Sequence, residues 1–131
     1  MDVEELMGWL SRFGELVTMS VRIFRECSGL CGDLSIRYLM ILLGLDLINF
    51  CRYFGYEVES CYDDVLKMCG NSIMKGFHET VDVGKRLSAG EYIGNDFLKH
   101  IINELPMIYL CLSRMIASNI SKSKTLSHLI E

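Results

Sequence analysis

The chain has 131 residues, a length typical of one domain, and half of the residues are hydrophobic while 23% are charged. This composition excludes an intrinsically disordered chain, which combines low hydrophobicity with high charge. The formal net charge is −4, so the positive field on which nucleic-acid binding depends is missing. We expect a single helical domain over residues 1–131 that does not bind nucleic acid.

The N-terminal segment is predicted to be an amphipathic helix from Asp2 to about Glu26. Its apolar residues recur at spacings of three and four, and its charged residues keep to other faces. The apolar positions are Leu6, Leu10, Phe13, Val17, Val21 and Phe24. Because residues 1–5 lack the basic and apolar stretches of a secretory signal, an intracellular, cytoplasmic location is predicted.

A second helix is predicted from Leu34 to Phe54, after a glycine-containing break at residues 28–32. Its apolar residues surround the whole circumference, so other helices should enclose it. They include Leu39, Met40, Ile41, Leu42, Leu43, Leu45, Leu47, Ile48 and Phe50. The uncharged apolar stretch at residues 38–45 is far shorter than the roughly 20 residues that cross a bilayer, so no transmembrane span is expected.

A third helix is predicted from Glu57 to Lys75, with Gly76 ending it. The following residues 77–90 include His78 and Glu79 and are polar, contain glycine and are only weakly periodic. This pattern indicates a short helix or a loop.

The C-terminal part is predicted to begin a helix near residue 92, because Ser88 and Glu91 have the spacing of a capping box. Pro106 lacks an amide hydrogen, so we expect two helices or one bent helix around it, and a polar break at residues 121–124. Sustained period-two alternation is missing from the sequence. The predicted fold is therefore an all-α, compact bundle of five to seven helices around a hydrophobic central helix at about residues 34–54.

The cysteines are predicted to be reduced thiols. Most lie among apolar neighbours in predicted helices, where a free cysteine behaves as a small hydrophobic residue. The six are Cys27, Cys31, Cys51, Cys61, Cys69 and Cys111. Cys27 and Cys31 have a C-x3-C spacing, but zinc needs four ligands and no second pair follows at a familiar distance.

Two polar features of the predicted helices are candidate sites. Asp46 interrupts the central helix, where a carboxylate must find a partner or shift its pKa. The plainer interpretation is that Asp46 reaches solvent or pairs with Arg37, Arg52 or a residue of another helix.

The second candidate is formed by Asp96, His100 and Glu104, which recur every four residues on one helix face. A carboxylate beside an imidazole suits a metal ligand or a general base. The alternative is a solvated surface stripe, because one stripe supplies too few ligands and no second Glu-x-x-His appears.

Residues 55–77 resemble the third-helix region of all-α nucleotide pyrophosphohydrolases, through Lys67, Asn71 and Lys75. The resemblance covers less than a fifth of the chain and implies a magnesium-dependent hydrolase of nucleotides. The acidic residues implied as its ligands are Glu15 and Asp46, with Glu57, Glu59, Asp63 or Asp64 as further candidates.

The two acidic motifs of that family, Glu-x-x-Glu and Glu-x-x-Asp, are incomplete here. Arg12 stands three residues before Glu15, and Leu43 stands three residues before Asp46.

The preferred function is a non-enzymatic protein that binds another protein, by self-association, by a groove that accepts a partner helix, or by both. The high apolar content predicts that some apolar surface remains exposed after the core is filled. Common catalytic motifs are missing, so no catalytic residue and no cofactor are assigned. A homo-oligomer is expected, and regulators of signalling or cell death are a class suggested by fold-level analogy.

Overall fold

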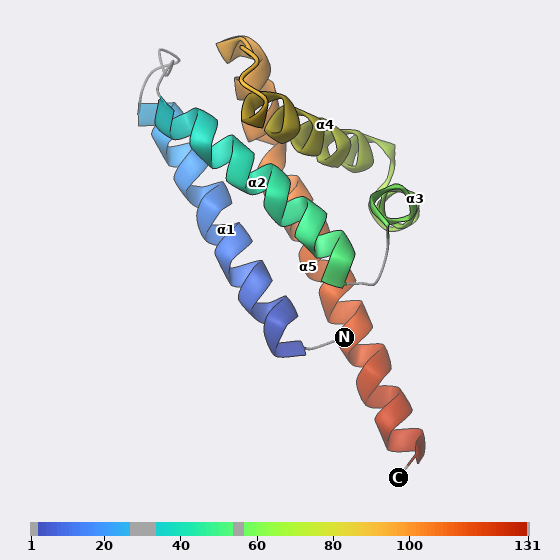
Figure 1. Cartoon of the computed structure of the whole chain (residues 1–131). Helices are drawn as coiled ribbons and strands as arrows, with labels where there is room; N and C mark the ends of the chain where they lie inside the picture. The colour runs from blue at the N-terminus through green and yellow to red at the C-terminus, as the bar shows by residue number, and fades with distance from the viewer. Residues whose placement is uncertain (1–2, 27–33, 54–56, 131) are drawn as a thin grey trace.

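The computed structural model describes residues 3–26, 34–53 and 57–130, with side chains for all of these except Leu34, Val58 and residues 122–130. Within these ranges the chain is all-helical (Figure 1). The five helices are α1 (Val3–Glu26), α2 (Leu34–Tyr53), α3 (Val58–Cys69), α4 (Asn71–Ser88) and α5 (Asn95–Ile130). The predicted all-α bundle is confirmed, with five helices in the described part of the chain.

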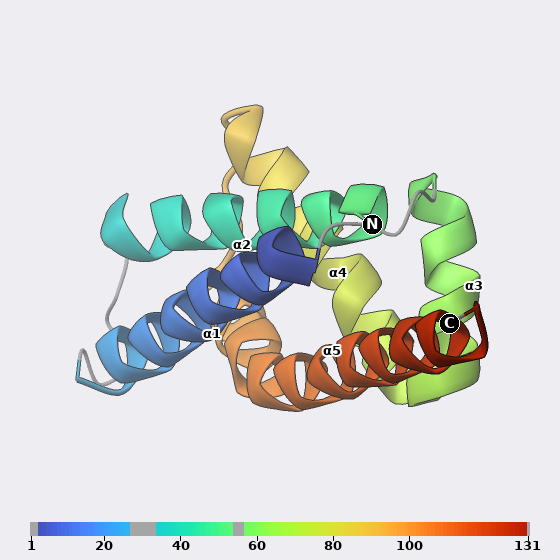
Figure 2. The same ribbon diagram turned by 90° about the horizontal axis from the view of Figure 1, so that it is seen from below.

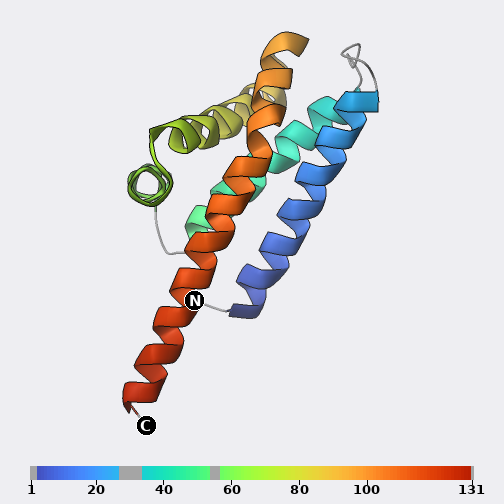
Figure 3. The same ribbon diagram turned by 180° about the vertical axis from the view of Figure 1, so that it is seen from behind.

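The helices surround a core to which all five contribute buried side chains. Helix α2 contacts α1 on one side and α4 on the other, while α5 contacts α1, α3 and α4. Figure 3 shows α5 beside α1, with the C-terminal part of α5 extending beyond the other helices. Figure 2 shows the short helix α3 at one end of the bundle, close to α4. None of the described helices has a stretch both long and apolar enough to cross a lipid bilayer.

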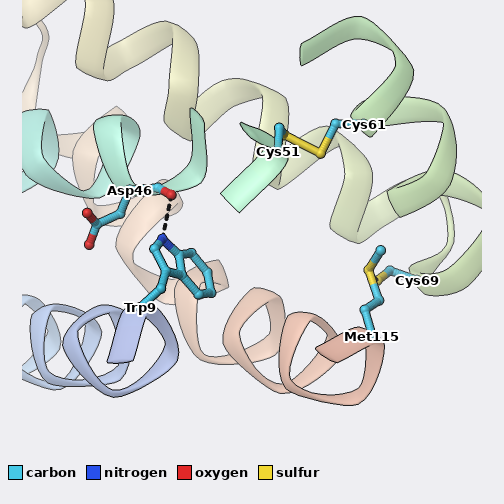
Figure 4. Close-up of a disulfide and its surroundings, with 6 residues drawn as sticks. All are labelled: Trp9, Asp46, Cys51, Cys61, Cys69 and Met115. Atoms are coloured by element: carbon cyan, nitrogen blue, oxygen red, sulfur yellow. Dashed lines mark hydrogen bonds between the residues drawn. A yellow bond between two sulfur atoms is a disulfide. The ribbon is translucent and has the colours of Figure 1, made fainter. Parts of the chain in front are cut away.

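Aromatic rings join the helices at the centre of the core. The Trp9 ring on α1 stacks on Phe13, with 4.9 Å between centroids, and lies 5.1 Å from the Phe50 ring of α2. Phe50 in turn makes an edge contact with Phe77 of α4. The indole Nε1 of Trp9 donates a hydrogen bond of 2.7 Å to the backbone oxygen of Asp46 (Figure 4). These contacts satisfy the polar atom of a buried tryptophan while its rings exclude water.

Helices α2 and α4 approach each other through glycine. A Cβ atom at Gly44 would lie 3.1 Å from the Cα of Gly84 and 3.2 Å from the backbone oxygen of Thr80. Only hydrogen at these positions permits such a close backbone approach. The contact between α2 and α4 is therefore backbone against backbone.

The predicted bounds of the second helix agree with α2 to within one residue, but its complete enclosure is not confirmed. Tyr38 is 62% exposed and Leu45 is 52% exposed. The Arg37 guanidinium lies over the ring of Tyr92, with 4.8 Å from its Cζ to the ring centroid. Helix α2 is buried on the faces toward α1 and α4, and part of its remaining surface is open.

The prediction for residues 57–90 was wrong in two respects. The chain breaks at Gly70, whose φ of +90° favours glycine, and not at Gly76. Residues 71–88 then form one continuous helix, α4, where a short helix or a loop was considered. Helix α4 is amphipathic, with Phe77, Val81 and Leu87 on its buried face, and Gly76 and Gly84, which suggested a helix end and a loop, lie on the same face. Tertiary packing buries these small residues, which a hydropathy pattern does not mark.

The expected helix start at Ser88 and Glu91 was also wrong, because α4 ends at Ser88 and α5 begins at Asn95. Glu91 instead accepts a hydrogen bond of 2.6 Å from Nε of Arg86. Pro106 lies on the exposed side inside α5, which continues through it and through the expected polar break at residues 121–124. Packing against α1, α3 and α4 supports the helix despite the missing backbone donor.

The prediction of reduced thiols was wrong for the described cysteines. Disulfides join Cys51 to Cys61 (Figure 4) and Cys69 to Cys111, with Cα separations of 5.5 and 5.9 Å. The first bond ties the beginning of α3 to α2, and the second ties its last residue to α5. The partners lie 10 and 42 residues apart, so only the tertiary fold brings them together. The C-x3-C pair of residues 27 and 31 lies outside the described residues.

Candidate functional site

The predicted stripe on α5 contributes two residues to a group that spans two helices. His100 Nε2 lies 3.4 Å from Oε1 of Glu104, one helical turn away, and 3.5 Å from Oε2 of Glu79 on α4. One ligand atom from each of the three residues lies within 4.8 Å of the others. Among the described residues, this is the group of three or more potential metal ligands that the fold assembles. We call it the Glu–His–Glu cluster.

A glycine makes room for the Glu–His–Glu cluster. Gly76 precedes Glu79 by one turn of α4, and a Cβ atom at Gly76 would lie 2.5 Å from Oε2 of Glu104. The carboxylate of Glu104 therefore rests against the backbone of α4. Thr80, next to Glu79, is buried and donates its hydroxyl to the backbone oxygen of Gly76 at 2.7 Å.

The cluster is graded in its access to water. The side chain of Glu79 is 20% exposed, and its Oε2 is buried without a hydrogen-bond partner among the described residues. His100 is 53% exposed, so it lies at the outer edge. In this arrangement the two carboxylates can pair with the imidazole of His100 in its protonated form. Alternatively, all three side chains together can bind a metal ion.

The sequence pattern found only part of this cluster. His100 and Glu104 belonged to the predicted stripe, whereas Asp96 is exposed and lies outside the cluster. Glu79 was not assigned, because residues 77–90 were not recognised as a long helix. In the sequence, the feature that could have indicated Glu79 is Gly76, which stands one turn before it and lies on the buried face of α4.

Asp46 lies in α2 beside a positive charge from α1. Burial raises the pKa of its carboxyl group, and the nearby Arg12 acts in the opposite direction. Its Oδ2 is buried without a hydrogen-bond partner among the described residues. The positive charge that acts on Asp46 is therefore Arg12, a residue of another helix, and not Arg37 or Arg52.

The acidic residues of the predicted magnesium site do not form part of the cluster. Glu15 lies on the exposed side of α1, and Asp46 lies on α2. The further candidates Glu57, Glu59, Asp63 and Asp64 lie at or in α3 and are also outside the cluster. The magnesium-dependent reaction remains a prediction from the sequence resemblance.

A groove of about 1130 Å³ opens between the second half of α1 and the middle of α5. Val17 and the half-buried Val21 and Tyr109 form its inner side, and Leu110 borders it on α5 with 47% of its surface exposed. The α1 side also carries exposed charged groups, which are Glu15, Arg22, Arg25 and Glu26. We call this feature the α1/α5 groove.

Within the α1/α5 groove, the ring of Tyr109 on α5 packs against Gly14 of α1. A Cβ atom at Gly14 would lie 2.9 Å from Cε2 of Tyr109, so this ring occupies the space beside the glycine. The sequence predicted a groove in general terms but not its position, because hydropathy does not show which helices become neighbours.

Comparisons with models of protein families, with curated proteins and with solved structures found no match.

Proposed function

We propose that this protein acts by binding another protein, and that the α1/α5 groove receives an amphipathic helix of that partner. The observation that carries the proposal is the groove itself, with apolar side chains along its inner side and exposed charged side chains along one border. Helix-in-groove recognition requires this combination of an apolar floor and a polar rim.

The dimensions of the groove support a helical occupant. Its border on α1 runs from Ser11 to Glu26, which corresponds to about 22 Å at 1.5 Å of rise per residue. A helix of roughly four turns has this length. Its apolar residues would lie against Val17, Val21 and Leu110, at spacings of three and four positions along the partner helix.

The charges of the groove favour a partner with carboxylates at one end. Arg22 and Arg25 follow each other by one turn near the end of α1, and neither forms an ion pair with another described residue at 4.0 Å or less. Carboxylates of a partner helix opposite these two residues would gain charge-assisted hydrogen bonds. Glu15 lies farther along the same border and Glu26 lies beside Arg25, so a preferred direction of the bound helix rests on Arg22 and Arg25.

The test uses peptides selected for binding from a displayed library of helical sequences. Both the polar and the apolar positions of these sequences are varied. We expect the selected peptides to share apolar residues one turn apart and an acidic end. Affinity is then measured by fluorescence anisotropy for the unmodified protein, for Leu110→Asp and for the matched control Leu45→Asp. Leu45 is 52% exposed and lies on α2, outside the groove.

We expect Leu110→Asp to weaken binding by at least about tenfold, because it places a charge in an apolar contact. Leu45→Asp should bind as the unmodified protein does, and Arg22→Glu should lose the preference for acidic peptides. Equal binding by Leu110→Asp, or failure to select any peptide, would contradict the proposal. A dimer in sedimentation analysis that Leu110→Asp dissociates would show that the occupant is a second copy, as the expected homo-oligomer requires, and would overturn the helical partner proposed here.

The compartment in which this protein acts is open to the same kind of reasoning. Disulfides persist in oxidising compartments and are uncommon in the cytosol. The bonds Cys51–Cys61 and Cys69–Cys111 therefore weigh against the predicted cytoplasmic location. Labelling of thiols in protein taken directly from its source tests this point, and free thiols at these positions would restore the cytoplasmic prediction.

A further inference from the structure

We propose that the Glu–His–Glu cluster binds one divalent metal ion of the zinc type, held by Glu79, His100 and Glu104. The site lies between α4 and α5 and is independent of the α1/α5 groove, which neither Glu79 nor His100 lines. An imidazole nitrogen with carboxylate oxygens is a ligand set that zinc and related transition-metal ions accept.

The distances within the cluster suit a shared ion. Ligand atoms that each lie about 2.1 Å from a tetrahedral ion are about 3.4 Å apart. His100 Nε2 lies 3.4 Å from Glu104 and 3.5 Å from Glu79. A direct charge-assisted hydrogen bond would be about 2.7–2.9 Å long. The two separations from His100 are therefore longer than a direct charge-assisted hydrogen bond and match those of two ligands on one tetrahedral ion.

A second observation concerns the inner carboxylate. Oε2 of Glu79, the atom that faces His100, is buried and has no hydrogen-bond partner among the described residues. A buried carboxylate oxygen without a hydrogen bond is costly unless a cation lies beside it. A metal ion bound to Glu79 and His100 would supply that charge.

The surrounding fold holds the ligands in place. Glu79 precedes the buried residues Thr80 and Val81 in α4, and His100 precedes the buried Ile101 in α5. Gly76 leaves room for Glu104, as described above. Three protein ligands leave a fourth position on a tetrahedral ion for water or another ligand.

The test measures binding of Zn²⁺ by isothermal titration calorimetry and of Co²⁺ by visible absorption, with the disulfides kept oxidised. A Cys27→Ser, Cys31→Ser background removes the C-x3-C pair as a competing ligand set. In this background we compare Glu79→Gln, His100→Gln and Glu104→Gln with two matched controls. His78→Gln changes a neighbouring exposed histidine of α4, and Asp96→Asn changes the stripe residue outside the cluster.

We expect one Zn²⁺ ion to bind per chain. The absorption spectrum of bound Co²⁺ should be typical of an ion with a low coordination number. Each change within the cluster should weaken Zn²⁺ binding by at least about tenfold, the loss seen even for residues that only support metal ligands. Both controls should bind as the background protein does. Circular dichroism tests whether each variant is folded. Any variant that is unfolded is replaced by the Ala substitution at the same position.

Gly76→Ala provides an independent check, because it changes none of the three ligand residues. The added Cβ atom would displace the Glu104 carboxylate, so Zn²⁺ affinity should fall while the helix content is kept. Failure of the background protein to bind Zn²⁺, or equal Zn²⁺ affinity in His100→Gln and His78→Gln, would overturn the proposal.

Discussion

Two helix pairs of this protein are each built around glycine and yet differ in what they leave open. At the contact of α2 with α4, Gly44 and Gly84 bring backbone against backbone, and no side chain separates the helices at that point. At the contact of α1 with α5, the ring of Tyr109 fills the space beside Gly14, and both residues line the α1/α5 groove. The first pair is closed, and the second leaves the α1/α5 groove open, where we propose that a partner helix binds.

A glycine in a helix does not have the same effect on packing at every position. Its effect depends on whether the atom opposite is rigid backbone or the end of a side chain. A backbone neighbour cannot move without distorting a helix, whereas the Tyr109 ring can turn toward the groove. The closed pair should therefore be sensitive to small changes that the open pair tolerates.

The largest expected effect concerns the disulfides, which link α3 to α2 and α5 but leave α1 without a covalent link among the described residues. Loop entropy gives upper values of about 3 kcal/mol for Cys51–Cys61 and about 4 kcal/mol for Cys69–Cys111. We expect Cys69→Ser, Cys111→Ser to lower the free energy of unfolding more than Cys51→Ser, Cys61→Ser, as measured by urea titration. Equal stability with and without a thiol reductant would show that the bonds do not contribute.

The next effect is that of Gly44→Ala in the closed pair. The added Cβ atom would lie 3.1 Å from the backbone of α4, so the two helices must separate. Overpacking costs about 1–3 kcal/mol, which exceeds the gain of about 1 kcal/mol in helix propensity on replacing glycine with alanine. We expect the free energy of unfolding to fall by up to about 2 kcal/mol in urea titration. A more stable variant would mean that the contact is looser than the geometry indicates.

Gly14→Ala is the same change in the open pair, and its effect should be smaller. The new Cβ atom meets the end of the Tyr109 ring, at 2.9 Å from Cε2, and this ring can move. The gain in helix propensity should offset the shift, leaving stability within about 1 kcal/mol of the unmodified protein. Because the ring would move into the groove, binding of the selected helical peptides should weaken. A loss of stability as large as that of Gly44→Ala would remove the distinction between the two pairs.

The smallest effect is expected at Asp46, whose backbone oxygen accepts the Trp9 hydrogen bond between α1 and α2. Burial raises the pKa of its carboxyl group above the ordinary 3.8, so the folded state binds the proton more tightly than the unfolded state. Stability from this group is present below pH 3.8 and is lost as the pH rises through the folded-state pKa.

Asp46→Asn should therefore raise the free energy of unfolding at pH 7, by less than about 1 kcal/mol, and have no effect well below pH 3.8. Urea titrations at the two pH values check this difference. A loss of stability at pH 7 would show that attraction to Arg12 outweighs the cost of burial.

The candidate metal site illustrates how far sequence patterns reach. A spacing of four residues placed His100 and Glu104 on one face of a helix, and the structure confirms that they are neighbours. Glu79 was not found, because Gly76 suggested the end of a helix at a point where α4 continues. A ligand set drawn from two helices needs the packing of those helices, which the pattern of one helix does not contain.

Local physical chemistry was enough to predict the all-helical class, the bounds of α1 and α2 and the amphipathic face of α1, because hydropathy periodicity and turn residues act within a few positions of the chain. Tertiary structure alone decided the pairing of the cysteines, the open face of α2 and the meeting of Glu79 with His100. These features depend on which surfaces of distant segments pack together, and packing is set by shape and volume across the whole core.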